Sequence, residues 1–299
     1  MTSVAVVAHA GKTLGGGLSE LRRVLAGAGI DDPAWFEVAK SKYAPDCVRE
    51  AVDGGADLLF VWGGDGMVQR CIDAVGDAPV VLAILPAGTG NLLARNLGIP
   101  IDLAQAVEIG LHGARRTIDV GRVNGERFAV MAGTGIDALM IRDADRDLKD
   151  RFGRAAYVWT GAKHLRFEPF RVRIDVDGHR WFDGTAGCVL VGNVSKVFGN
   201  IEAFDDASPE DGRLELGVVT AKGAVQWLRA LARTAIGSAE RSKFVRTTKA
   251  QTIRIRLDEK LPYELDGGDK KPTKQLRIDV QPAAVTLCVP EGAAARGAS

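Results

Sequence analysis

Three short apolar segments, each followed at once by a glycine-rich loop, constrain the first part of this chain more than any other feature. The segments are VAVVA (4–8), DLLFVW (57–62) and VVLAILP (80–86). Stretches with apolar residues at helical spacing follow them, at 18–29, 67–75 and 91–98. Continuous apolar strands that alternate with helices form a parallel sheet with helices on both faces. The sequence therefore predicts an α/β domain over residues 1–119.

After residue 119 the apolar pattern changes its period. The segments FRVRIDVDG (170–178), TIRIRLD (252–258) and LRIDV (276–280) alternate apolar and polar residues, as half-exposed antiparallel strands do. One longer helix is expected at 224–237. We predict a β-rich, antiparallel, sandwich-like domain over residues 120–290, and we expect the tail 291–299 to return to the first domain.

Composition and charge exclude several classes of protein. The formal net charge is +1, so no overall basic field points to nucleic acid. No apolar run is long enough for a transmembrane helix, and the N-terminus lacks the pattern of a signal peptide. The 4 cysteines stand far apart without metal-binding spacing and read as buried apolar residues. We expect a cytoplasmic protein that is able to work at the inner face of a membrane.

Two of the glycine-rich loops, GGDG (63–66) and AGTGN (87–91), join a strand to a helix. Glycine lets a ligand approach the backbone, and the start of a helix offers unpaired N–H groups and a positive dipole end. Such a loop suits phosphate, and two side by side suit a polyphosphate. Asp65 repels phosphate unless a divalent cation lies between them, bound directly or through water.

A purely structural interpretation of these loops remains open. The glycines can simply make tight turns, and Asp65 can cap a helix. Neither the P-loop nor the Rossmann pattern is present, so it is the pairing of the loops that favours phosphate. A third loop, AHAGKTLGGG (8–17), places Lys12 at the same sheet edge, where it can reach phosphate or remain a solvated lysine.

GGDG followed by LPAGTGN resembles the diacylglycerol-kinase-type lipid kinases, specifically their small bacterial members. The similarity continues in the same order over nearly the whole chain. Its further segments are AHAGK, IDVGRVNGERFAVMAGTGIDA (118–138), LKDRFGRAAY (148–157), GNVSKVFGNIEAFDDASPEDGRLEL (192–216) and YELDGGDK (263–270). The resemblance implies that the α/β domain binds ATP and Mg²⁺ and that the β-rich domain helps to form a lipid cleft.

The resemblance also assigns residues. It implies phosphorylation of the hydroxyl of diacylglycerol or a related lipid, with Asp266 as the general base. The Asp-Gly pair at Asp266 is equally a common hairpin turn. The residues expected around the nucleotide are Lys12, Gly63, Gly64, Asp65, Gly66, Gly88, Thr89, Gly90 and Asn91.

A second metal site is implied in the β-rich domain. There Asp211 and the backbone carbonyls of Ser208 and Arg213 would hold a structural magnesium, in addition to Asp65 at the phosphates. The alternative is an Asp-Gly turn without an ion. Lys149 falls where the family carries a basic residue near the cleft, although its charged surroundings also suit a solvated helix face.

Several positions depart from the family pattern. Met67 and Leu92 replace a hydroxyl and a carboxylate near the phosphates, and Gly268 replaces the glutamate of the late motif. Gln69-Arg70 stands for Asn-Glu, and His9-Ala10 for Asn-Pro. These departures keep two alternatives open: an NAD kinase-like phosphotransferase, and a nucleotide- or lipid-binding protein with weak catalysis.

Contact with a membrane surface is expected of a lipid kinase. The helix at 224–237 is followed by a basic stretch at 241–249, and together they could hold the protein at an anionic leaflet. The alternative is an ordinary packed helix followed by a solvated loop. A homodimer through an edge strand of the β-rich domain is compatible with the sequence.

Overall fold

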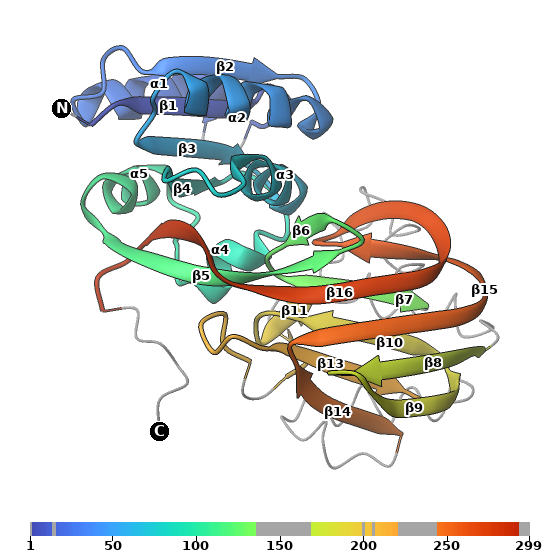
Figure 1. Cartoon of the computed structure of the whole chain (residues 1–299). Coiled ribbons are helices and arrows are strands. Elements are labelled where there is room, and N and C mark those ends of the chain that lie inside the picture. Colours follow the sequence, from blue (N-terminus) through green and yellow to red (C-terminus); the bar gives the residue numbers. More distant parts are fainter. Residues whose placement is uncertain are drawn as a thin grey trace. The chain divides into compact units, whose positions relative to one another are not determined.

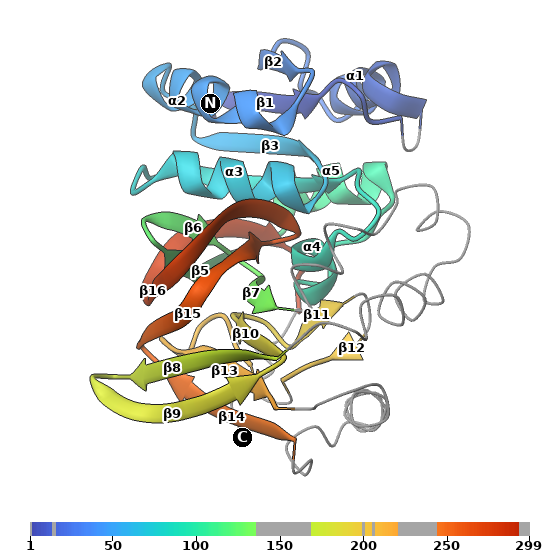
Figure 2. The ribbon, with the colours of Figure 1, turned by 90° about the vertical axis from the view of Figure 1, so that its right-hand side faces the viewer.

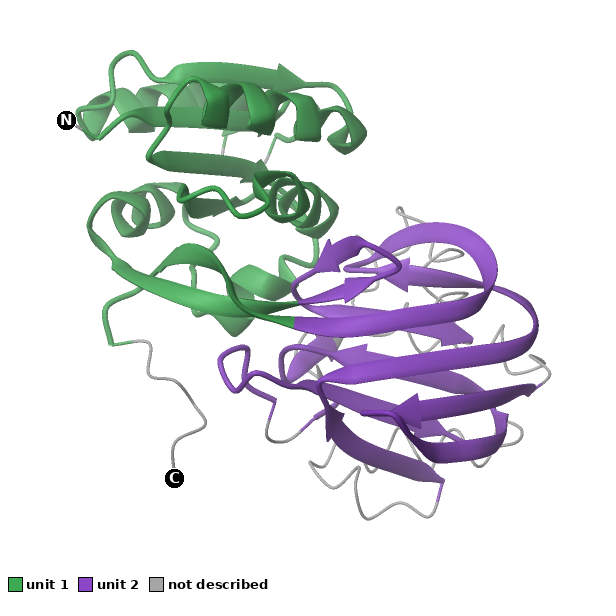
Figure 3. Ribbon diagram, in the orientation of Figure 1, with its two compact units in different colours: residues 1–120, 281–299 green, residues 121–280 purple. Residues whose placement is uncertain are grey.

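The computed structural model describes residues 2–13, 16–135, 169–198, 201–204, 207–220 and 244–292. The chain forms two compact units (Figure 3). Unit 1 comprises residues 1–120 and 281–299, and unit 2 comprises residues 121–280. The chain leaves unit 1 within β5 (Ala114–Val123) and returns to it within β16 (Gly268–Val289). The end of β16 thus belongs to unit 1, whereas the sequence assigned residues up to 290 to the second domain.

Unit 1 contains a parallel sheet, as the sequence predicted (Figure 1). Its strands are β1 (Val4–His9), β2 (Ala34–Val38), β3 (Leu58–Gly63) and β4 (Val81–Pro86), in the order β2-β1-β3-β4. The end of β16 adds a further parallel strand, because Thr286 and Leu287 pair with β4. All six residues of β3 are buried, which explains its continuous apolar sequence.

Helices connect these strands and pack in pairs. They are α1 (Gly17–Gly27), the short 3-10 helix η2 (Ser41–Tyr43), α2 (Ala44–Asp53), α3 (Asp65–Val75), α4 (Leu92–Asn96) and α5 (Leu103–His112). Helix α1 packs beside α5, and α2 packs beside α3. Asp102 caps α5 by accepting the Gln105 N–H at 2.9 Å. The sequence patterns predicted α1, α3 and α4. They did not predict β2, α2 or α5.

The register of the parallel strands brings the three glycine-rich loops to one edge of the sheet. Ala8 pairs with Trp62, and Gly63 pairs with Pro86, so β1, β3 and β4 end at the same level. The Ala87 N–H donates to the Gly63 carbonyl at 2.8 Å, directly after both strands end. The loops predicted to cradle phosphate therefore leave the sheet side by side.

Unit 2 consists of antiparallel strands, which confirms the predicted β-rich part (Figure 2). Strand β15 pairs with β7, β8 and β16, and β10 pairs with β7 and β13. The strands not yet given are β6 (Glu126–Phe128), β7 (Met131–Gly135), β8 (Phe170–Val176), β9 (His179–Ala186), β10 (Cys188–Gly192), β11 (Lys196–Phe198), β12 (Ile201–Glu202), β13 (Leu214–Val219), β14 (Val245–Ala250) and β15 (Thr252–Leu265).

The alternating segments behave as predicted in this unit. Val172 and Ile174 on β8 and Ile253 and Ile255 on β15 are buried in one core cluster, while the residues between them face outward. The helix expected at 224–237 lies outside the described residues. None of the helices that the structure describes is long and apolar enough to cross a membrane.

The packing of α5 on the sheet of unit 1 makes a test of this fold. A Cβ at Gly110 would lie 2.3 Å from the Phe60 ring and 2.9 Å from the Cβ of Ala83. We expect Gly110→Ala to lower the free energy of unfolding by about 1–3 kcal/mol, because a close-packed interior has no room for the methyl group. Urea denaturation of the full chain measures this change.

Gly27→Ala is the matched control for that substitution. Nothing lies within 4 Å of a Cβ at Gly27, which is the last residue of α1. We expect no loss of stability there, and a gain of up to about 1 kcal/mol from the better helix propensity of alanine. Equal losses in both variants would contradict the packing of α5 described here.

Candidate active site

The loops after β3 and β4 touch each other through their backbones. A Cβ at Gly88 would lie 2.5 Å from the Cα of Gly64, and a Cβ at Gly64 would lie 3.0 Å from the Cα of Gly88. Glycine is required at both positions because no side chain fits between the two chains. The pairing of loops that the sequence suggested is therefore present in the structure.

Asp65 ties these loops together through its carboxylate. Its Oδ1 accepts the N–H of Leu92, the first residue of α4, at 2.5 Å. Its Oδ2 would lie 2.7 Å from a Cβ at Gly90, so that glycine leaves room for the carboxylate. Burial raises the pKa of the Asp65 carboxyl above its ordinary value, although backbone N–H donors at residues 91–93 partly offset the effect. The sequence analysis allowed Asp65 to cap a helix. In the structure its carboxylate accepts the first N–H of α4, the helix that follows the neighbouring loop.

Asn91 closes the second loop on itself. Its backbone is left-handed, with φ 47°, and its side chain accepts the Gly88 N–H at 2.9 Å and donates to the Gly88 carbonyl at 2.8 Å. Thr89, at the tip, is exposed. Nothing lies within 4 Å of a Cβ at Gly66, unlike the other glycines of the two loops. Gly66 and Thr89 therefore leave the surface of the paired loops open to a ligand.

The structure explains why a methionine stands at position 67, which the sequence did not reveal. Its side chain is 1% exposed, and its Cβ and Cγ would lie 2.5 Å from a Cβ at Gly63. Met67 thus packs under the first loop, where Gly63 makes room for it. The hydroxyl that the family pattern has at this position is replaced here by a buried apolar contact.

The loop after β1 is described in part, since residues 14 and 15 lie outside the description. The Lys12 N–H donates to the His9 carbonyl at 3.1 Å, and the ring Nδ1 of His9 accepts the Gly11 N–H at 3.1 Å. His9 therefore shapes the turn that carries Lys12. The Lys12 side chain is partly exposed at the sheet edge shared with the other loops.

Asp266, in unit 2, forms the predicted Asp-Gly hairpin between β15 and β16. Its φ of 46° and that of Gly267, 80°, are both positive, as a two-residue type I′ turn requires. The side chain is 3% exposed and accepts three backbone N–H groups. The donors are Ala129 to Oδ2 at 2.8 Å, and Val130 and Met131 to Oδ1 at 2.9 and 2.8 Å.

These bonds define the chemistry open to Asp266. Three N–H donors stabilise the ionised carboxylate and fix its position. A carboxylate has about four lone-pair sites, so three backbone bonds alone do not saturate it. The sequence found this residue by its motif, but it did not indicate the donors at residues 129–131. These hydrogen bonds hold the Asp266 carboxyl group in place, and the group anchors its own turn.

The loop of Asp211 carries an ion pair. Asp211 Oδ1 accepts the Arg213 N–H at 3.0 Å, and Oδ2 accepts from Lys249 Nζ at 3.0 Å. The same ammonium lies 3.1 Å from Glu215 Oε1. Burial works against the charged ammonium, but the hydrogen bonds to both carboxylates outweigh it and raise the pKa of Lys249. In the described part of the chain no group of three His, Cys, Asp or Glu residues could hold a metal.

This arrangement favours the turn without an ion over the predicted magnesium site at Ser208, Asp211 and Arg213. The Lys249 ammonium already supplies a positive charge to the Asp211 carboxylate. We therefore expect no magnesium at this loop in the wild type. The structure does not test the predicted magnesium site, which remains a prediction. Lys149, the helix at 224–237, Arg241 and Lys243 lie outside the described residues.

Two family models match the chain, one in each part. The model of the diacylglycerol kinase catalytic domain matches residues 4–123. The model described as the YegS C-terminal NAD kinase beta sandwich-like domain matches residues 130–289. The chain belongs to the bacterial diacylglycerol kinase/YegS-like family of lipid kinases.

Relatives agree with this membership. This lipid kinase is 30% identical over 228 residues to the diacylglycerol kinase of Bacillus subtilis (strain 168), covering 75% of each chain. It is 31% identical over 249 residues to a "Probable lipid kinase YegS-like" protein of Pseudomonas aeruginosa, covering 82% of this chain and 80% of the other.

Solved structures show the same fold. A crystal structure of a diacylglycerol kinase from Bacillus anthracis str. Sterne superposes with a TM-score of 0.75 at 21% identity and covers 98% of both chains. An NAD kinase from Archaeoglobus fulgidus in complex with ATP superposes with a TM-score of 0.55 at 13% identity, over 97% of this chain and 95% of the other. Both likenesses concern the fold alone.

The ion pair of Lys249 makes the metal question testable. We expect Lys249→Met to lower the free energy of unfolding by about 1–2 kcal/mol, because it leaves the buried Glu215 and the Asp211 carboxylate without their shared cation. We also expect the melting temperature of the wild type to be the same in MgCl₂ and in EDTA. That of the variant should rise in MgCl₂, as a divalent ion replaces the ammonium.

Lys271→Met, an exposed lysine on β16, is the control for nonspecific loss of charge. Its stability should stay near that of the wild type in both buffers. A wild-type melting temperature that rises with Mg²⁺ would support the predicted magnesium site and contradict the ion pair as its substitute.

Proposed function

We propose that this lipid kinase transfers the γ-phosphoryl group of ATP, with Mg²⁺, to the hydroxyl of diacylglycerol or a related lipid. The observation that carries the proposal is the pair of interlocked loops at the carboxyl edge of the parallel sheet in unit 1. Ligands of open α/β sheets bind at this edge. Membership of the lipid kinase family then makes a nucleoside triphosphate the expected ligand.

In this proposal the backbone of the two loops binds the phosphates. The segment Gly63–Gly66 contains the start of α3, an 11-residue helix whose N-terminus favours negative charge. The segment Gly88–Asn91 is held rigid by the Asn91 side chain, so its N–H groups need no ordering when the nucleotide binds. Lys12 adds a positive charge at the same edge.

Magnesium, when bound with the nucleotide, would neutralise charge on the phosphates. The described residues fit a water-mediated role for Asp65, because one of its oxygens is committed to the Leu92 N–H. Leu92 contributes no second carboxylate. Mg²⁺ commonly keeps several waters and binds through one or two carboxylates plus the substrate phosphates, and a single acidic residue is compatible with that pattern.

Asp266 is proposed as the group that accepts the proton of the lipid hydroxyl. A general base must be unprotonated and fixed in position. The three N–H donors at residues 129–131 favour both conditions, although they also weaken the carboxylate as a base. A mainly structural role in the hairpin would leave the same hydrogen bonds, so substitution has to separate the two.

Asp266→Asn is the decisive variant. With labelled ATP, Mg²⁺ and a total lipid extract, we expect label in the lipid fraction for the wild type and a rate at least about 100-fold lower for the variant. Affinity for ATP should be unchanged, since that site is assigned to unit 1. Thermal unfolding of the full chain, recorded in parallel, shows how far the Asn side chain disturbs the turn.

Asp269→Asn, an exposed carboxylate three residues further along β16, is the matched control and should keep full activity. A folded Asp266→Asn variant with wild-type turnover would refute the proposed role of Asp266 as general base. The same assay with NAD in place of lipid addresses the second alternative, and label in NAD would overturn the lipid kinase assignment. ATP binding without transfer to either acceptor would support a binding protein with weak catalysis.

Gly66 tests where the nucleotide binds. Because nothing lies within 4 Å of a Cβ there, we expect Gly66→Ala to leave stability unchanged but to weaken ATP binding about tenfold, by placing a methyl group on the open surface. Gly88→Ala should lower stability by about 1–3 kcal/mol, because its Cβ meets the Gly64 backbone. Calorimetric titration with ATP, combined with urea denaturation, measures both effects.

A further inference from the structure

One face of unit 2 carries an unusual concentration of arginine. It is formed by the outward side chains of β8, β9, β15 and β16 and by Arg122 of β5, which pairs with Asp279 at 3.0 Å. We call it the arginine face. Its charged members are Arg122, Arg171, Arg173, Arg180, Arg254, Arg256 and Arg277, together with Asp175, Asp183, Asp258 and Asp279. The exposed charges toward the β15–β16 hairpin are not counted in it; they are Glu259, Lys260, Asp269, Lys271 and Lys274. Seven positive against four negative groups leave an excess of three charges, in a chain whose net charge is only +1.

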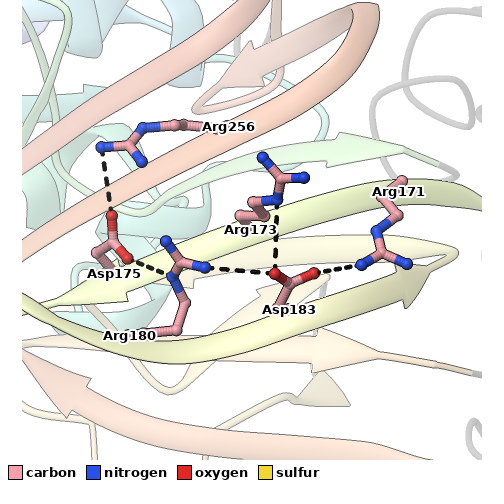
Figure 4. Close-up of polar contacts among 6 residues, drawn as sticks. All are labelled: Arg171, Arg173, Asp175, Arg180, Asp183 and Arg256. Carbon is pink, nitrogen blue, oxygen red and sulfur yellow. Dashed lines mark hydrogen bonds and ion pairs between the residues drawn. The ribbon is translucent and has the colours of Figure 1, made fainter.

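Each of two aspartates on this face forms ion pairs with more than one arginine. Figure 4 shows Asp183 between Arg171, Arg173 and Arg180, at 2.7, 3.5 and 3.3 Å. Asp175 lies 2.6 Å from Arg180 and 3.4 Å from Arg256. Two carboxylates therefore serve four guanidinium groups. Exposed ion pairs of this kind contribute little stability, so the network does not by itself explain the arginines.

The strand register also places arginines directly opposite each other. Arg173 on β8 pairs with Arg256 on β15, and Arg254 on β15 pairs with Arg277 on β16. Like charges directly opposite on one face of a sheet are destabilising. The same register sets Arg254 opposite Asp175 and Arg173 opposite Asp183, which offsets part of this repulsion. A bound anion would offset more of it.

The chemistry of the side chains indicates phosphate. Guanidinium groups bind phosphate oxygens in a bidentate way and lose less hydration than ammonium groups do. These side chains are near half exposed, at 52% for Arg171, 49% for Arg173 and 48% for Arg256. Across four strands spaced about 4.8 Å apart they cover roughly 14 Å, which suits several phosphate groups at once.

We propose that the arginine face docks this enzyme on a bilayer that contains anionic phospholipids. The inference rests on the proposed function, because a lipid kinase must reach its acceptor at a membrane. No helix in the described part of the chain could span one. Basic groups near an anionic leaflet are attracted to it, and the exposed face of a sheet can meet many headgroups together.

The basic stretch that the sequence suggested for this role contributes little where it is described. Lys249 is engaged with Asp211 and Glu215, and Arg246 stacks 5.1 Å from the centre of the Trp181 ring. We therefore place the docking surface on the sheet strands, while residues 241–243 of the basic stretch lie outside the described residues. Arginines on five strands form this face, and no local sequence window contains all of them.

The test compares two triple variants of the full chain. Arg173→Gln/Arg254→Gln/Arg256→Gln removes three charges from the arginine face and both arginine pairs. Arg22→Gln/Arg23→Gln/Arg49→Gln removes three exposed arginines from helices of unit 1, each of which also pairs with a carboxylate. The two variants lower the net charge equally, so a difference between them reports the face.

Sedimentation with vesicles is the measurement. We expect the wild type to bind phosphatidylcholine vesicles that contain phosphatidylglycerol, to release them at high salt, and to ignore pure phosphatidylcholine. The face variant should bind about 100-fold more weakly, at roughly fivefold per arginine, and the unit 1 variant about as well as the wild type. The melting temperature of the face variant should stay near that of the wild type, because losing the opposed arginines and losing their ion pairs with Asp175 and Asp183 act in opposite directions.

Three outcomes would overturn the proposal: wild-type vesicle binding by the face variant, equal losses in both variants, or tighter binding of the wild type to RNA than to the anionic vesicles. Activity separates docking from catalysis. With diacylglycerol in neutral detergent micelles, the face variant should turn over at the wild-type rate. If the wild type transfers no phosphate in micelles either, the proposed function fails, while the vesicle result still decides the docking surface.

Discussion

The backbone contact between Gly64 and Gly88 is the constraint on which the rest of the candidate nucleotide site depends. It holds two strand-to-helix loops against each other, and Asp65 and Asn91 then fix each loop by hydrogen bonds that reach across or back. A rigid cradle of this kind presents its N–H groups before any ligand arrives, which lowers the entropic cost of binding. Backbone N–H donors, among them that of Leu92, compensate in part for the burial of the Asp65 carboxyl group.

Most glycines of the motif serve the protein itself, and this changes how the motif is understood. Gly63 makes room for Met67, Gly64 and Gly88 for each other, and Gly90 for Asp65. A glycine-rich loop is often explained by the approach of the ligand alone. Here open space is found only at Gly66 among the glycines of the two loops, and the remaining glycines bring the supporting parts into contact.

The sequence predicted those features that depend on local patterns. Strand and helix periods gave the parallel and antiparallel parts, and family motifs gave the loops and Asp266. It could not give the partners that the fold brings together, such as Leu92 for Asp65, Lys249 for Asp211, or the N–H groups that hold Asp266. The alternation in FRVRIDV indicated which arginines face outward, but only strand register shows that they stand opposite further arginines.

The return of β16 to unit 1 has a consequence for how the molecule is made. The parallel sheet takes one of its strands from Thr286 and Leu287, near the end of the chain, while its other strands are synthesised within the first 86 residues. On the ribosome, that sheet keeps the edge of β4 uncovered until residues 286 and 287 have emerged. Unit 2, whose strands lie in between, has its sequence complete earlier. The domain encoded first is therefore the one finished last, and a chain cut short before residue 286 would carry an exposed strand edge into the cell.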